Sequence, residues 1–432
     1  AKRDVKEASS NLSKGKIKVN RAGWDKFPGD VFIFSHAPEG IEEIVLRVLE
    51  IDTGTLTDGA ITLTVVQDVF SLPLDVPEIS EQGNEWTTPS TAPAEATTAT
   101  LMELPYWALL DALGVAETGT LGDGAGYLAA LAAKPTPLTT DIDIWARISP
   151  ASYAEVRPEQ VCAPSAMLAS ALDRATDTDI QLDDLSQIED VEVDWLVQIG
   201  TGALAELCRV TAIDADAATV SVDRAILDTT PQTHDAATPL FFLPPSASDW
   251  ALDPTQYADS DTVDVKLQTG TASGEIDIST VTAISATMAS RQARPYPPGN
   301  LEINSEAYPT LLLGPLTVTW AERDRVVQGT TIVTQDDATD YGPESGTTYN
   351  AYAYDDDTNT LLDSDTGISA ATWSPVLYGS HMLRIEIEAE RDGYVSWQRQ
   401  VRSFTFIADR ARIVVSGDPR ETATGTIRDT TG

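Results

Sequence analysis

Three histidines, two cysteines and many carboxylates are the side chains of this sequence that could do acid–base, nucleophilic or metal chemistry. His36, His234 and His381 lie too far apart in sequence to form a local motif. No nucleophile elbow, P-loop, dinucleotide fingerprint or zinc-binding helix motif accompanies them. Catalytic groups can be assembled from distant residues, but the sequence itself predicts no catalytic, cofactor-binding or metal-binding residue and no cofactor.

The most calcium-like string is Asp355-Asp356-Asp357-Thr358-Asn359, followed by Asp363 and Asp365. An EF-hand loop requires glycine at its sixth position and a bidentate acid at its twelfth. Counted from Asp355, those positions hold Thr360 and Thr366. The string therefore favours a polar hairpin turn, with a looser calcium site as the alternative.

Other acidic groups follow patterns of exposed surfaces. Residues 173–194 include nine acidic side chains without fixed ligand spacing, which favours a solvated face over a metal site. Glu386, Glu388 and Glu390 alternate along one predicted strand, so they share one face, which is usually the solvated side of a sandwich. Carboxylate pairs are too frequent in this chain to identify a glycosidase.

Aromatic and sulfur side chains give predictions of burial. Trp320 ends an alternating apolar strand and is expected in a core, whereas Trp397 follows a turn and is the better candidate for a surface role. Cys162 and Cys208 have neither a disulfide framework nor metal-ligand spacing. We expect both to be buried free thiols.

The charge of the chain limits its partners. Its 432 residues include 67 acidic and 28 basic ones, for a formal net charge of −39. Such a field repels nucleic-acid phosphate and anionic bilayers, so we expect no nucleic-acid partner. Lysine is scarce after Lys26 and arginine supplies most of the positive charge. This composition indicates adaptation to brine, with an ordinary acidic surface as the alternative.

No apolar run reaches the roughly 18 residues of a membrane helix. The charged start Ala1-Lys2-Arg3-Asp4 is not followed by the apolar run of a signal peptide. We therefore expect that the protein is made in the cytoplasm and that it does not insert stably into a membrane.

The first part of the chain is patterned as strands. We expect a short helix over 4–12, a buried strand over 31–34, and a hairpin that joins 43–52 to 60–66 through Asp58-Gly59. The Pro- and Thr-rich segment 77–100 is typical of a linker.

Two helical patterns follow that linker, over 102–113 and 126–134. Short strands then continue to residue 288, and the clearest hairpin joins 208–213 to 219–222. Ala293-Arg294-Pro295-Tyr296-Pro297-Pro298-Gly299 is a stiff boundary because proline fixes φ and blocks helix on both sides. The strands beyond it predict an Ig-like sandwich.

The sequence thus predicts a mainly β fold of several small β-domains in series with a few short helices. The expected parts are the end of a hub-like β-domain (1–76), a linker with short helices (77–140), a small barrel or sandwich (141–292), a fibronectin type III-like domain (293–408) and a C-terminal tail (409–432).

Several segments resemble the C-terminal fibronectin type III region of tail hub proteins from siphovirus-like phages and gene transfer agents, the tail tip attachment or host specificity proteins. The resemblance lies in Arg-Pro-Tyr-Pro-Pro-Gly-Asn-Leu-Glu-Ile-Asn (294–304), Leu-Thr-Val-Thr-Trp-Ala-Glu-Arg-Asp-Arg (316–325), and segments 342–349 and 391–398. Further matches fall in 29–32, 45–52, 58–70 and 223–231 with His234. The sequence departs from the family at Glu322, where histidine is common, and lacks counterparts of the large N-terminal hub domains and the glycosidase-like barrel.

The resemblance implies a structural hub at the distal tail of a virion, a homotrimer that joins the tail tube to fibres or receptor-binding parts. Its partners would be other tail or baseplate proteins, with a host surface glycan or S-layer as a further partner. Brine adaptation adds a halophilic host, a haloarchaeon or a halophilic bacterium. The resemblance supplies no functional residue, because the shared motifs look structural.

Two other functions stay open from the sequence. The first is a dedicated receptor- or glycan-binding tail protein, in which loops of the 293–408 sandwich provide the affinity. The second is a cell-wall hydrolase at the tail tip, which would need two close carboxylates or a histidine beside a nucleophile in a cleft. The sequence favours the structural hub over these two functions, and we expect that the protein is not an enzyme.

Overall fold

A computed structural model describes residues 13–39, 41–55, 59–68, 91–174 and 178–408. The chain divides into two compact units, Ala1–Pro89 and Ser90–Gly432. Strands dominate both units and form six sheets among the described residues. The predicted fold class, mainly β with several small β-modules in series and few short helices, is confirmed.

The first unit is one antiparallel four-stranded sheet in the order β1-β4-β3-β2. Its core comes from alternate residues of the two central strands, such as Val48 and Leu63, because successive side chains of a strand point to opposite faces. Its elements are β1 (Lys14–Val19), the 3₁₀ turn η1 (Arg21–Gly23), β2 (Val31–His36), the 3₁₀ turn η2 (Ala37–Glu39), β3 (Ile41–Asp52) and β4 (Ile61–Gln67).

The predicted hairpin of this unit is confirmed by the antiparallel pairing of β3 with β4. The prediction of a buried strand over 31–34 is wrong in its burial. β2 is the edge strand of the sheet and Ile33 is 68% exposed. An apolar run cannot distinguish a central strand from an edge strand, since pairing depends on distant residues. The helix predicted over 4–12 lies outside the described residues.

In the second unit, residues 91–298 form a part that we call the middle body. Two of its sheets, β15-β6-β5 and β17-β16-β7-β8 with β18 paired to β16, share a core that includes Leu128, Ile144 and Val265. Their elements are β5 (Ala99–Glu103), α2 (Tyr106–Leu113), α3 (Val115–Thr118), β6 (Ala125–Ala132), β7 (Thr139–Ile148), β8 (Ala154–Gln160), η5 (Ala247–Asp249), β15 (Leu252–Ala258), β16 (Thr262–Thr271), β17 (Gly274–Glu275), β18 (Ile284–Thr287) and η6 (Arg291–Ala293).

A six-stranded sheet, β10-β13-β12-β11-β14-β9, is inserted between β8 and β15. It contains the predicted hairpin of 208–213 with 219–222, which is confirmed as β12 paired with β13. Phe241 faces the α2 side of this sheet, whereas Phe242 faces its other core. The elements are β9 (Ser165–Met167), β10 (Asp179–Gln181), β11 (Leu196–Ile199), η4 (Gly202–Leu204), β12 (Glu206–Asp214), β13 (Thr219–Asp223) and β14 (Pro239–Leu243).

The helix predicted over 126–134 is wrong, because this segment is strand β6, placed between β5 and β15. The helix predicted over 102–113 is confirmed only from Tyr106 onward, since Ala99–Glu103 is strand β5. The predicted boundary at 140/141 does not separate structural parts. Strands on either side of it pack into one core, and residues 91–140 are not a linker. Residues 77–90 lie outside the described residues.

Residues 299–407 form a two-layer sandwich, the two-sheet arrangement expected for this segment. Its sheets are β19-β21-β24 and β20-β27-β25-β22-β23, with β26 paired to β25. Trp320 from one sheet packs edge-on against Tyr349 from the other, with ring centroids 5.2 Å apart. The elements are β19 (Gly299–Ile303), β20 (Leu311–Leu313), β21 (Val318–Ala321), α4 (Arg325–Gln328), β22 (Thr348–Asp355), β23 (Thr360–Ile368), β24 (Thr372–Trp373), β25 (Ser380–Arg391), β26 (Tyr394–Val395) and β27 (Gln400–Ile407).

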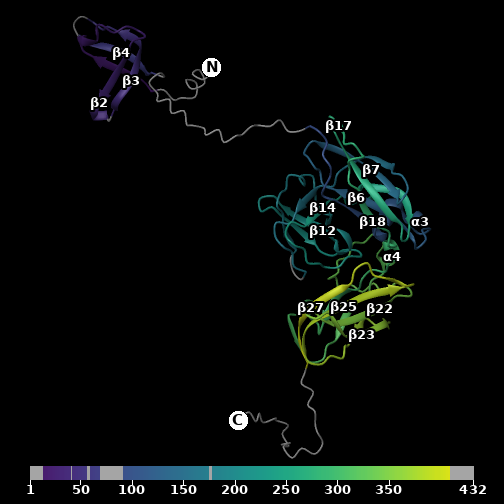
Figure 1. Cartoon of the computed structure of the whole chain (residues 1–432). Coiled ribbons are helices and arrows are strands. Elements are labelled where there is room, and N and C mark those ends of the chain that lie inside the picture. The colour runs from purple at the N-terminus through teal and green to yellow at the C-terminus, as the bar shows by residue number, and fades with distance from the viewer. Residues whose placement is uncertain (1–12, 40, 56–58, 69–90, 175–177, 409–432) are drawn as a thin grey trace, which may run out of the picture. The chain divides into compact units, whose positions relative to one another are not determined.

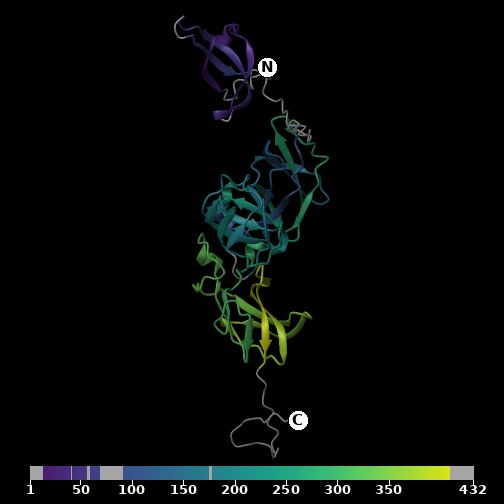
Figure 2. The ribbon, with the colours of Figure 1, turned by 90° about the vertical axis from the view of Figure 1, so that its left-hand side faces the viewer.

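Figures 1 and 2 show the sandwich, with β22, β25 and β27, directly against the middle body that contains β12 and β14. None of the helices in the described segments has the length and apolar character needed to span a bilayer.

Candidate functional site

The junction between the middle body and the sandwich concentrates buried polar groups. Arg291, in the turn η6, donates from Nε and Nη2 to the two carboxylate oxygens of Asp228, at 2.6 and 2.8 Å. Its Nη1 donates to the carbonyl oxygen of Glu103 at 2.8 Å. The ring of Trp397, from the sandwich, lies 4.8 Å from the Arg291 guanidinium. One buried arginine therefore joins β5, the loop after β13 and the sandwich.

A second buried cluster ties the sandwich to the η6 segment. Arg325 and Arg391 both donate to the carboxylate of Glu344. Nη1 of Arg325 also donates to the carbonyl oxygen of Gln292, and Nη2 of Arg391 to that of Ala293. Burial lowers the pKa of Arg325 and of Arg391. Burying an unpaired cation costs a large free energy. The carboxylate shared by Arg325 and Arg391 offsets much of this cost.

Gln398, just before β27, inserts its amide into the middle body. Its Oε1 accepts from the backbone nitrogen of Thr230 at 2.8 Å, and its Nε2 donates to the carbonyl oxygens of Ala203 and Ala205 at 2.9 and 2.8 Å. Both ends of the amide are thus satisfied by backbone groups of the other module. Such bonds fix the relative orientation of two modules, because a buried polar group left unpaired is costly.

The close approach of backbone and side chains also explains a glycine of this junction. A Cβ at Gly299 would overlap the guanidinium of Arg323, which donates to the carbonyl oxygens of Thr334 and Asp337. Residues of 294–304, 316–325, 342–349 and 391–398 therefore contribute side chains to the same junction.

Beneath the junction lies a fully buried carboxylate, Glu206. It accepts from Arg224 Nε and Nη2 at 2.9 and 2.7 Å, from the backbone nitrogen of Gln232 at 3.0 Å and from His234 Nε2 at 3.1 Å. Burial acts to raise the pKa of Glu206, but the hydrogen bonds of His234 and Arg224 outweigh it and lower the pKa overall. Glu206 is therefore an ionised structural anchor.

Cys208 lies beside this cluster, with its Sγ 3.6 Å from Glu206 Oε1. A cysteine, a carboxylate and a histidine so close together could suggest a nucleophilic site. Burial, however, raises the pKa of the Cys208 thiol well above its usual range, and Glu206 raises it further. A thiol without thiolate character and without access to substrate is a poor nucleophile. Cys162 and Cys208 are both buried and free, which confirms the prediction for them.

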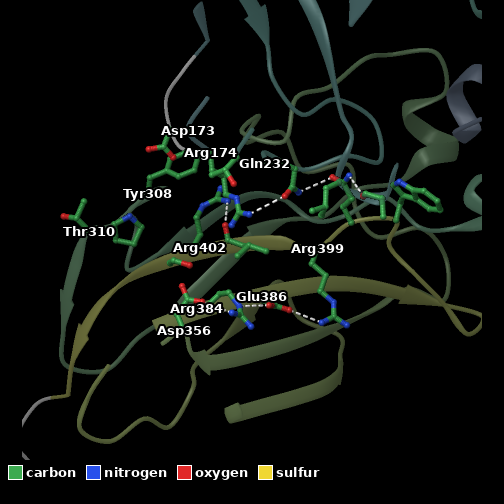
Figure 3. Close-up of a pocket in the computed structure, with 18 residues that line it drawn as sticks. Asp173, Arg174, Gln232, Tyr308, Thr310, Asp356, Arg384, Glu386, Arg399 and Arg402 are labelled. Atoms are coloured by element: carbon green, nitrogen blue, oxygen red, sulfur yellow. Dashed lines mark hydrogen bonds and ion pairs between the residues drawn. The ribbon is translucent and has the colours of Figure 1, made fainter. Parts of the chain in front are cut away.

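A cleft of about 800 Å³ opens along one side of the junction (Figure 3). The loops after β9 and β13 form one wall with Arg174 and Gln232, and the sandwich forms the other with Tyr308 and Arg402. Trp397 and Gln398 line the end nearest the buried clusters. The volume lies within the usual range of ligand sites, roughly 300 to 1,000 Å³.

The sandwich wall carries a ladder of paired charges. Arg384 donates to Asp356 and Glu386, each at 2.7 Å, and Arg399 donates to Glu386 and Glu388 at 2.9 and 2.6 Å. Glu386, Glu388 and Glu390 share one face of β25, as predicted, but this face is not simply solvated: Glu388 is only 2% exposed. The arginine and tyrosine side chains of neighbouring strands cover it.

The structure separates the other residues that the sequence singled out. His36 stacks on Phe34 in the first unit, His234 binds Glu206, and His381 Nδ1 lies 2.7 Å from Asp355 Oδ2 in the sandwich. Trp320 is buried as predicted, and Trp397 is half-buried between the cleft and Arg291.

The Asp-rich string 355–359 is the β22–β23 turn, which confirms the hairpin prediction. Its carboxylates bind Thr358, Arg384 and His381. Within the described ranges no group of three or more His, Cys, Asp or Glu side chains could hold a metal ion. All the described acidic side chains of 173–194 are exposed, as predicted.

The sequence did not reveal the junction residues or the arginines of the cleft. For the arginines of the cleft the signal was compositional, since arginine supplies most of the positive charge of a lysine-poor chain.

Comparisons with known proteins do not assign this chain to a family. No protein-family model and no curated protein matches it. Among solved structures, Escherichia coli alpha-2-macroglobulin activated by porcine elastase aligns at 12% identity with a TM-score of 0.17. That alignment covers 92% of this chain, which spans 32% of the other. A similarity at this level carries no argument about fold or function.

Proposed function

We propose that the chain is a structural component of the distal tail, a tail hub or tail-tip protein, of a tailed virus. It would join the tail tube to fibres or receptor-binding parts during attachment to a halophilic host, acting as a homotrimer with other tail proteins as partners. It would act mechanically, without turning over a substrate.

One observation carries the proposal: several segments of the second unit that resemble tail hub proteins meet at a single junction of buried, hydrogen-bonded polar groups. Arg291 with Asp228 and Gln398 with Thr230 are its two sides. A junction of this kind fits a load-transmitting role, because it holds two modules in one orientation. The net charge of −39 supports assembly in brine, where salt screens self-repulsion.

Immunogold electron microscopy tests this proposal. Antibodies raised against the chain should label one end of the tail on particles from cells that carry the gene. Label confined to capsids, or protein recovered only free of particles, would contradict it.

The cleft favours a second candidate, a receptor- or glycan-binding tail protein. Its volume, its aromatic groups Tyr308 and Trp397 and its polar walls are typical of a site for a small polar ligand. The two functions are compatible, because a hub can also contact the host.

A further inference from the structure

Two guanidinium groups in the cleft lack the compensation that its other arginines have. Arg402 on β27 is only 3% exposed. Its Nε donates to the carbonyl oxygen of Ala307 at 2.6 Å and its Nη1 to Gln400 Oε1 at 3.1 Å. Its buried Nη2 has no hydrogen-bond acceptor in the described part of the chain. Asp336 Oδ1 lies 3.7 Å from this nitrogen, which makes a loose ion pair but is too long for a hydrogen bond.

Arg174 reaches the same place from the opposite wall. Its Nη2 makes a long hydrogen bond of 3.4 Å to Gln232 Oε1, and its buried Nε has no acceptor among the residues that the structure describes. Figure 3 shows the Arg174 and Arg402 side chains converging beside Gln232. Burial lowers the pKa of both guanidinium groups, and the charge of Arg402 lowers that of Arg174 further.

The paired arginines of the sandwich wall make the contrast clear. Arg384 and Arg399 are held by carboxylates at 2.6 to 2.9 Å. A buried cation that lacks such a partner is destabilising, and like charges brought together add to the cost. In a chain with this excess of carboxylates, two converging arginines with spare donors are unusual, and an oxyanion would satisfy both.

The surroundings suit a sugar that carries such an anion. The Tyr308 ring lies 4.2 Å from the Arg402 guanidinium, and its hydroxyl donates to Asp336 at 3.0 Å. Thr310 and Ser403 add hydroxyl groups to the lining, and Trp397 adds an aromatic surface. Aromatic rings with a few hydroxyl and amide groups bind the apolar face and the hydroxyls of a saccharide.

We propose that the cleft binds an acidic saccharide, with the carboxylate or sulfate of the sugar held between Arg174 and Arg402. The saccharide as ligand deepens the proposed attachment function and rests on it. The binding of an oxyanion by the two guanidinium groups rests on the geometry alone.

Isothermal titration calorimetry of the full chain tests whether the cleft binds such ligands. All titrations use one ionic strength, at which the chain is folded. The probes are inorganic sulfate, tetragalacturonate with its uncharged methyl ester, and sulfated maltotetraose with unsulfated maltotetraose. The first saccharide pair reports on a carboxylate and the second on a sulfate. We expect saturable binding of at least one charged saccharide and about tenfold or more weaker binding of its uncharged counterpart.

Arg174→Gln is the test variant and Arg384→Gln the matched control. Both remove one positive charge from the same cleft, but only Arg174 has a donor without an acceptor. We expect Arg174→Gln to weaken binding by about tenfold or more, and Arg384→Gln by less than about threefold.

Three results would overturn the proposal: no saturable binding of any charged probe including sulfate, equal binding of charged and uncharged saccharides, or equal losses in the two variants. Equal losses in the two variants would show that binding depends only on the net charge of the cleft. Sulfate binding without saccharide binding would retain the oxyanion site and remove the sugar. None of these outcomes depends on whether the chain is found in a particle, so this test and that of the tail-hub proposal fail independently.

Discussion

The amide oxygen of Gln398, two residues before the last sandwich strand, lies 2.8 Å from the backbone nitrogen of Thr230 in the middle body. The two residues are 168 positions apart in sequence. Gln398 is thus a side chain of one module that completes the backbone hydrogen bonding of another. The stability of the sandwich and the orientation of the middle body should therefore depend on each other.

Replacing Gln398 with alanine should loosen the junction. The variant leaves Thr230 N–H and the carbonyl oxygens of Ala203 and Ala205 without their partner. We expect a loss of about 2 kcal/mol in the free energy of unfolding, the usual cost of unpaired buried polar groups. Urea denaturation measures it. Gln181→Ala, at an exposed position of β10, is the control, and equal losses in the two variants would argue against a special role for Gln398.

Arg291→Lys should destabilise the chain although the charge is kept. Lysine cannot reproduce the two parallel bonds to Asp228 together with the bond to the carbonyl oxygen of Glu103. We expect a loss of about 3 kcal/mol, as for other disrupted buried ion pairs.

Arg147→Lys is the matched control for this variant. Arg147 binds Asp264, but its side chain is 30% exposed, and this partly exposed pair should contribute less than the buried one, about 1 kcal/mol. The interpretation of the Arg291 cluster would be wrong if both lysine variants unfolded at the same urea concentration.

His381 should titrate above the ordinary histidine value. The hydrogen bond that His381 donates to the carboxylate of Asp355 raises the pKa of His381 above 6.5, and a further bond to the carbonyl oxygen of Tyr378 acts in the same direction. The protonated imidazole stabilises the folded state, so this contribution is complete below pH 6.5 and disappears as the pH rises through the raised pKa. NMR titration of the ring protons gives the value directly.

The variant Asp355→Asn should return the pKa of His381 toward 6.5, because it removes the carboxylate that raises this pKa. A His381 pKa that is unchanged by this substitution would contradict the ion pair.

Salt should stabilise the folded chain. The net charge of −39 produces self-repulsion in the compact state. The Debye length falls from about 10 Å at 0.1 M to about 3 Å at 1 M, so screening should raise the melting temperature. Differential scanning fluorimetry in potassium chloride and in choline chloride should give similar increases, because screening depends on ionic strength. An unchanged melting temperature between 0.1 and 1 M would contradict adaptation to brine.

Local regularity explains which parts of the fold the sequence revealed. The hairpins β3–β4 and β12–β13 alternate apolar and polar residues on either side of a turn, and each pattern is contained in fewer than about 30 residues. Strand β6 was missed because Ala125–Ala132 is rich in alanine and leucine, the best helix formers. Its pairing with β15, more than a hundred residues away, overrides that preference.

Sequence patterns could not predict the junction either, because its contacts join residues that are far apart in the sequence. Asp228 and Arg291 are 63 residues apart, and Gln398 is indistinguishable by type from any exposed glutamine. Only the resemblance to tail hub proteins drew attention to 294–304 and 391–398, without indicating that these segments meet. In the cleft, Arg174 and Arg402 belong to different modules, so neither alone marks a site.

A reconstruction of the intact particle by cryo-electron microscopy would show whether this chain forms part of the tail end. We expect density at the distal end of the tail into which residues 91–408 fit as one body, with the junction of Arg291 and Gln398 preserved. A particle whose tail end is fully explained by other chains, or in which the sandwich is detached from the middle body, would contradict it.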